Sequence, residues 1–119
     1  MTKIIDCIQK IDDMKIARAK KYLESNKVIS AKLMNEDFDD PDEFEAFIGE
    51  RGTVFMPVIE VDKTFNVLNT HCQCNDESDM CVHKAALLLA AQLMIEVNCP
   101  DYHMAVKLQI ANFLSNILS

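Results

Sequence analysis

Four residues with metal-binding side chains lie within twelve positions of this 119-residue chain. Cys72 and Cys74 form a Cys-x-Cys pair, and after six further residues Cys81 and His83 form a Cys-x-His pair. Structural zinc sites take four thiolate or imidazole ligands in a tetrahedron, so the chain must deliver two close pairs from two local structures. The spacing therefore predicts that these four side chains bind Zn²⁺, and the fold must bring the two pairs together.

The remaining cysteines and histidines are predicted to lie outside this site. Five cysteines is an odd number, and three of them are clustered, which is typical of a metal site in a reducing compartment rather than of a disulfide framework. Cys7 and Cys99 have apolar neighbours and are interpreted as small buried hydrophobic residues. His71 precedes Cys72 on the same expected strand and would point to its other face, at the surface or as an outer partner of the ligands. His103 is predicted to be an exposed residue of the last helix.

Length and hydropathy indicate a single soluble domain, 1–119, in which a metal would add to a modest core. No apolar run reaches the roughly 18 to 20 residues that a membrane span needs. Asp6 also interrupts the apolar region that a signal peptide would require. We therefore expect an intracellular protein of a reducing compartment, cytoplasmic or nuclear.

The net charge of −7 argues against a domain-wide basic surface for nucleic acid. Acidic residues are concentrated in 36–45, which is interpreted as a solvated loop between two strands. Basic residues gather before it, in 15–32. They are interpreted first as a helix face and second as a surface for nucleic acid or a partner, with the candidates Lys15, Arg18, Lys20 and Lys21.

Hydrophobic periodicity predicts an α+β fold with a small antiparallel sheet of about four strands. Residues 1–26 have helical spacing, with a break or new N-cap at Asp12-Asp13 and a second helix from about 13 to 25. Strands are predicted at 28–34, 53–61 and 64–70, the last two as a hairpin, while 44–50 fits either a strand or one helical turn. Pro57 cannot donate a ladder hydrogen bond, so its strand would lie at an edge there or contain a bulge.

Two helices are predicted after the strands. The first begins near Met80 or Cys81, capped by Ser78 or Asp79, and continues to Val97. Cys81 should lie at its entry, because residues two apart within a helix point about 200° apart. Thiolates would be favoured at that N-terminus by the unpaired amides. The second helix, 101–119, has an apolar stripe at helical spacing, formed by Val106, Ile110, Phe113, Leu114, Ile117 and Leu118.

The order of strand, Cys72-Gln-Cys74, loop, Cys81-Val-His83 and a helix rich in alanine and leucine resembles the SWIM-type zinc finger. Residues 17–28 also resemble the helix that precedes this finger in many bacterial and archaeal members, so the resemblance covers roughly 17–92, with the finger at 72–83. It implies that the four residues above bind zinc. Members of that family occur beside Swi/Snf-type helicases, in transposase-related proteins, in ubiquitin-ligase-linked kinases and in small partners of recombinase paralogues, and the finger is assigned to DNA or protein binding. The acidity of this chain and the lysine after His83 depart from the family pattern.

The leading hypothesis is a non-enzymatic, zinc-stabilised interaction module that contacts a protein partner, such as a helicase or recombination-type assembly. Direct nucleic-acid binding through the basic helix 15–32 is a second hypothesis. An acidic regulator or DNA mimic using 36–45 is a third. An enzyme is least favoured, because a catalytic zinc keeps an open position and only Glu77 would be placed as its base. The two glycines, Gly49 and Gly52, also form no phosphate-cradling loop.

Overall fold

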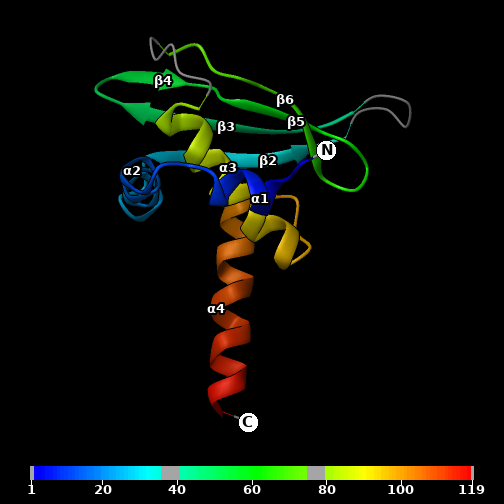
Figure 1. Ribbon diagram of the computed structural model, residues 1–119. Helices are drawn as coiled ribbons and strands as arrows, with labels where there is room; N and C mark the ends of the chain where they lie inside the picture. The colour runs from blue at the N-terminus through cyan, green and yellow to red at the C-terminus, as the bar shows by residue number, and fades with distance from the viewer. Residues whose placement is uncertain (1, 36–40, 75–79, 119) are drawn as a thin grey trace.

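The computed structural model describes residues 2–35, 41–74 and 80–118, the last seven of these as backbone only. An antiparallel sheet lies on one side of the molecule and helices cover one of its faces (Figure 1). The predicted α+β class is confirmed. In chain order the elements are β1 (Thr2–Lys3), α1 (Ile4–Gln9), α2 (Asp13–Glu24), β2 (Val28–Met34), β3 (Asp42–Glu50), β4 (Thr53–Phe55), β5 (Val58–Val61), β6 (Asn66–His71), α3 (Val82–Glu96) and α4 (Tyr102–Leu118).

The described part of the chain forms six strands rather than the expected four or so, in the order β1-β6-β5-β3-β2, with β4 also paired to β3. One added strand is β1, which pairs antiparallel with β6. The other arises because the predicted strand 53–61 is two strands. Pro57 separates them; it lacks an N–H, and its carbonyl oxygen accepts a hydrogen bond from Ala46 N at 3.2 Å. The sheet therefore breaks at this proline instead of forming one long strand.

The acidic run 36–45 was expected to be a solvated loop, and for Asp42 and Glu43 this is wrong, because β3 begins at Asp42 and pairs with β5 and β2. The strand alternative for 44–50 is confirmed, whereas 36–40 lie outside the described residues. The strand alternates, with Asp42, Phe44, Ala46 and Ile48 on the buried face. Asp42 is only 6 % exposed, and its carboxylate accepts a hydrogen bond from Lys63 Nζ at 2.8 Å. The ion pair with Lys63 offsets the free-energy cost of burying the Asp42 carboxylate on this face of the strand.

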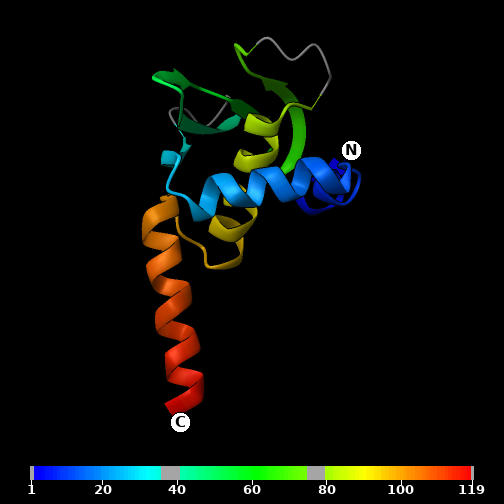
Figure 2. The same ribbon diagram turned by 90° about the vertical axis from the view of Figure 1, so that its left-hand side faces the viewer.

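The core lies between the sheet and α3, with α1, α2 and the start of α4 packed against the other sides of α3. α2 crosses α3 below the sheet (Figure 2). The predicted break before α2 is confirmed, since Asp12 is its N-cap and its side chain accepts a hydrogen bond from Met14 N at 2.8 Å. α3 is apolar on nearly every side and is buried accordingly, through Val82, His83, Ala85, Ala86, Leu87, Leu88, Ala90, Ala91 and Met94.

α4 begins against the body and then projects away from it (Figures 1 and 2). Its base is held at three points: Leu33 N donates to Pro100 O at 2.8 Å, His103 Nε2 lies 2.8 Å from Ile29 O, and Ala105 is fully buried. Within the described residues, no helix has the length and apolarity that crossing a membrane requires.

Candidate metal centre

The two predicted ligand pairs come together. The ligand atoms of Cys72, Cys74, Cys81 and His83 all lie within 4.8 Å of one another, so this cluster could hold a metal ion. Cys81 and His83 are buried, and Cys72 and Cys74 are half-buried. The cluster brings two residues that follow β6 next to two residues at the start of α3.

Each pair is positioned by the end of a regular element. β6 ends at His71, and Cys72 and Cys74 lie in the segment that follows this strand. Cys81 is the N-cap of α3, with the extended backbone angles φ −84° and ψ 168°, and its sulfur accepts from Lys84 N at 3.4 Å. The prediction that Cys81 lies at the helix entry is confirmed, but the prediction of Ser78 or Asp79 as the N-cap is wrong, because Cys81 itself is the N-cap and the helix begins at Val82. The extended backbone at Cys81 lets its sulfur and the His83 ring point to the same place.

Burial makes the metal-free thiols weak acids. It raises the pKa of Cys72 to about 12, helped by the adjacent Cys81 and opposed by a backbone hydrogen bond within the motif. Burial also raises the pKa of Cys81, against the effect of the Lys84 amide. Both groups are therefore protonated thiols at neutral pH until a cation replaces their protons.

The imidazole of His83 is oriented by a carboxylate from the sheet. Its Nδ1 lies 3.8 Å from Cys72 Sγ, while its Nε2 lies 2.9 Å from Glu50 Oε2 at the end of β3. The Tyr22 hydroxyl of α2 donates to the other oxygen of Glu50 at 2.6 Å, and this bond and that of His83 lower the pKa of Glu50. A metal-binding histidine usually donates its second nitrogen in this way, which fixes its tautomer and makes it a stronger ligand. The geometry therefore leaves Nδ1 for the metal.

Two aromatic rings enclose the imidazole. The Phe55 ring is stacked on His83, with the centroids 4.4 Å apart and the planes 19° from parallel, and the Tyr22 ring meets it edge-on at 5.9 Å. Together they cover parts of the imidazole that would otherwise meet water. Sequence reasoning missed Glu50, Tyr22 and Phe55 as members of this site. They are remote from the motif in sequence, and no local spacing connects them to it.

The two other histidines and the two other cysteines lie outside the ligand cluster, as predicted. His71 is exposed and is not part of the ligand cluster, and His103 is exposed on α4, where its Nε2 faces a backbone oxygen. Cys7 and Cys99 are half-buried and pack against the core, so their predicted role as small hydrophobic residues fits. Glu77 lies outside the described residues.

The four basic candidates do not form one surface. Lys15 is half-buried and its Nζ donates to Met80 O at 2.6 Å, next to the metal cluster. Arg18, Lys20 and Lys21 are exposed on α2, where Arg18 and Lys21 share one face but Lys20 lies about 200° around the helix from Arg18. Lys15 therefore acts as a local tether between α2 and the segment before α3.

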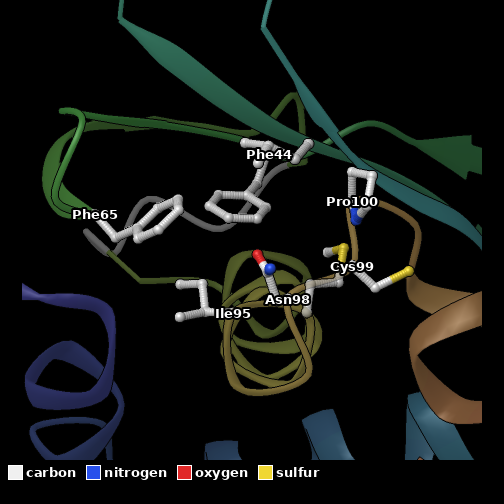
Figure 3. Close-up of a pocket in the computed structure, with 8 residues that line it drawn as sticks. Phe44, Phe65, Ile95, Asn98, Cys99 and Pro100 are labelled. Carbon is white, nitrogen blue, oxygen red and sulfur yellow. The ribbon is translucent and has the colours of Figure 1, made fainter. Parts of the chain in front are cut away.

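A separate pocket of about 150 Å³ lies between the sheet and the loop from α3 to α4 (Figure 3). The rings of Phe44 and Phe65 line one side, and Ile95, Asn98, Cys99 and Pro100 line the other (Figure 3). The Cys99 thiol donates to Asp101 O at 3.5 Å. The pocket shares no residue with the metal cluster, and its lining is too apolar to supply an acid, a base and a nucleophile together.

Comparisons of the chain with protein-family models, with curated proteins and with solved structures found no match.

Proposed function

We propose that this protein is a non-enzymatic zinc-binding interaction module of the SWIM type. The observation that carries the proposal is the closed set of four ligands, three sulfurs and one nitrogen, gathered between a strand end and a helix N-terminus. Catalytic zinc sites usually have three protein ligands and leave the fourth position to water or substrate, whereas structural sites fill all four. A complete Cys₃His set supports a structural metal.

Zinc suits this donor set better than other common cations. Thiolate and imidazole ligands in a tetrahedron are typical of Zn²⁺, while Mg²⁺ and Ca²⁺ require oxygen ligands. With Zn–S bonds of about 2.3 Å and Zn–N bonds of about 2.0 Å, two sulfur ligands in a tetrahedron are roughly 3.8 Å apart, and a sulfur and a nitrogen ligand roughly 3.5 Å. The separation of 3.8 Å between Cys72 Sγ and His83 Nδ1 is close to the second value, and every pair lies within 4.8 Å. Binding would need movements of only about 1 Å in the remaining ligands.

The charge distribution favours a protein partner over DNA. Proteins that bind duplex DNA neutralise several phosphates with clustered Lys and Arg side chains, and this chain has a net charge of −7. Of the four basic candidates, Lys15 donates to Met80 O, and the other three provide one pair on a shared face of α2, Arg18 and Lys21, with Lys20 about 200° from Arg18. The family resemblance places such a module in a DNA-associated assembly, where other subunits would supply the contacts to DNA.

The two other hypotheses have less support. Direct nucleic-acid binding through 15–32 still has exposed Arg18, Lys20 and Lys21, so charge reversal at Lys20 and Lys21 should weaken any such binding. In the acidic-mimic hypothesis, Asp42 would be one of the acids that contact the partner, but it is buried and paired with Lys63 in the sheet. A mimic has to present its carboxylates to a partner, so this acid cannot serve.

Two measurements test the proposal. Native mass spectrometry of the purified protein should find one zinc per chain, and the Co²⁺-substituted protein should have the visible spectrum of a tetrahedral thiolate site. A titration with duplex and single-stranded DNA across salt concentrations should find at most weak binding. One ligand that can be replaced without loss of zinc would indicate an open, catalytic site, and tight DNA binding with a steep salt slope would overturn the preference for a protein partner.

A further inference from the structure

We infer that α4 is a self-association surface, on which the chain pairs with α4 of a second copy. This inference goes beyond the proposed zinc function and does not depend on it. It starts from a contrast between two helices of the same chain. α3 and α4 are both apolar around most of their circumference, but the sheet, α1 and α2 cover α3, whereas α4 projects from the body (Figures 1 and 2).

The exposure of α4 is unusual for its composition. Between Tyr102 and Leu118 the sequence has one lysine, Lys107, and no arginine, aspartate or glutamate. A helix that is apolar on all sides is normally buried. Yet Met104 and Ile110 are each 54 % exposed and Leu108 is 40 % exposed, while Ala105 at the base is fully buried. The contacts with the body therefore use one side of the first turns and leave Met104, Leu108 and Ile110 exposed, and beyond them the helix backbone continues away from the body (Figures 1 and 2).

The spacing of the apolar residues points to a helical partner. Val106, Ile110, Phe113 and Ile117 are separated by four, three and four residues, which is the alternation of a coiled-coil seam. Ile110 and Ile117 then occupy the positions at which β-branched residues favour two-stranded pairing. The seam points about 100° around the helix from Ala105, so a partner helix would not compete with the body.

The chemistry of the flanks favours an identical partner. Non-identical coiled-coil partners are selected by complementary charges beside the seam. Four residues flank the seam here, and only the first of them is charged: Lys107, Gln109, Leu114 and Asn116. In a pair of identical helices, the apolar seam of one copy packs against the apolar seam of the other. Neither copy has an acidic residue that pairing would bury without a partner. A lipid surface fits less well, because helices that lie on membranes have a basic polar face and the whole chain is anionic.

The area is that of a weak dimer. Ile110, Phe113, Leu114 and Ile117 are the large apolar residues at the seam or beside it, and burying each removes roughly 100 Å² from water. Two copies together would bury about 800 Å², below the range of stable complexes and in that of weak, transient ones. The predicted association is therefore reversible and depends on protein concentration.

Light scattering and analytical ultracentrifugation of the full chain, at concentrations up to about 100 µM, test this inference directly. The mass of the wild-type protein should rise with concentration toward twice that of one chain. Ile110→Asp and Phe113→Asp should each weaken the dimer by at least about 100-fold, because the lost anchor is present in both copies. Leu108→Asp is the matched control: it is also exposed on α4, but two residues from Ile110 and so about 200° away, and should remain dimeric.

Circular dichroism and metal content should be unchanged in all three variants, which separates loss of pairing from loss of folding. A wild-type monomer, or a dimer that Ile110→Asp and Phe113→Asp leave intact, would overturn the inference. A monomer that binds phosphatidylcholine or phosphatidylserine vesicles would assign α4 to a lipid surface instead and refute it equally. A zinc-loaded monomer would refute self-association alone, whereas a dimer unable to bind zinc would refute only the proposed zinc function.

Discussion

Replacing Glu50 with alanine should weaken metal binding by about 10- to 100-fold, although Glu50 is not a ligand. Its carboxylate lies 2.9 Å from His83 Nε2 and accepts from the Tyr22 hydroxyl at 2.6 Å. Without it, the imidazole loses the acceptor that fixes Nδ1 toward the three sulfurs. The expected loss corresponds to about 1.4 to 2.7 kcal/mol of binding free energy. The buried Tyr22 hydroxyl also loses its acceptor, which should lower the stability of the fold by about 1 to 3 kcal/mol.

Competition with a chromophoric zinc chelator at constant pH measures the affinity, and denaturant unfolding of the metal-free protein measures the stability. Glu50→Gln retains one acceptor oxygen and should lose less affinity than Glu50→Ala. Tyr22→Phe removes a single hydrogen bond, so it should cost about 1 kcal/mol of stability while changing affinity less than Glu50→Ala does.

Glu45→Ala provides the matched control for this prediction. Glu45 is on the same strand as Glu50 but on the opposite face of the sheet, so its removal should not change metal affinity. Wild-type affinity in Glu50→Ala, or an equal loss in Glu45→Ala, would refute the assignment of Glu50 as the partner that orients His83.

Four further predictions concern metal removal, the pH dependence of metal affinity, the pH dependence of stability and the N-cap of α2. Chelation or Cys74→Ser should unfold at least 64–93, seen as loss of amide-exchange protection; an unchanged melting temperature after verified metal removal would contradict it. Because metal displaces one proton from each of the three cysteine ligands, affinity should fall about 1,000-fold per unit of decreasing pH near neutrality, and a flat profile would contradict this. In the metal-free protein the raised pKa of Cys72 stabilises the fold at lower pH, so stability should decline as pH rises from about 8.5 toward 12, measured by denaturant unfolding. Asp12→Ala removes the N-cap of α2 and should cost about 1 kcal/mol, whereas Asp13→Ala, which leaves that cap in place, should cost less.

Local patterns predicted those elements whose residues determine their own conformation. β2 spans the predicted 28–34, α2 begins at the predicted Asp13, and α3 is entered through Cys81 as expected. In each case a cap or a β-branched run acts within a few residues of the element. Such signals need no knowledge of the remaining chain.

The errors arose where distant pairing outweighed composition. Asp42 and Glu43 are acidic, yet they begin β3 because β5 and β2 provide partners for it and Lys63 pairs with the buried Asp42. β1 has two residues and exists because β6 lies beside it. Strand pairing is a tertiary interaction, so neither result could be derived from local periodicity.

The sequence by itself determined the ligand set of the candidate metal centre, because all four ligands lie within twelve positions and a strand end followed by a helix start is enough to bring them together. Only the tertiary structure decided what surrounds and orients them. Glu50 is 33 residues from His83, and Tyr22 is 28 residues from Glu50, so these contacts exist only after β3 and α2 pack against α3. The tertiary structure likewise decided that only the start of α4, with the buried Ala105, packs against α3, while the rest of the helix projects from the body because the sheet, α1 and α2 cover the other sides of α3.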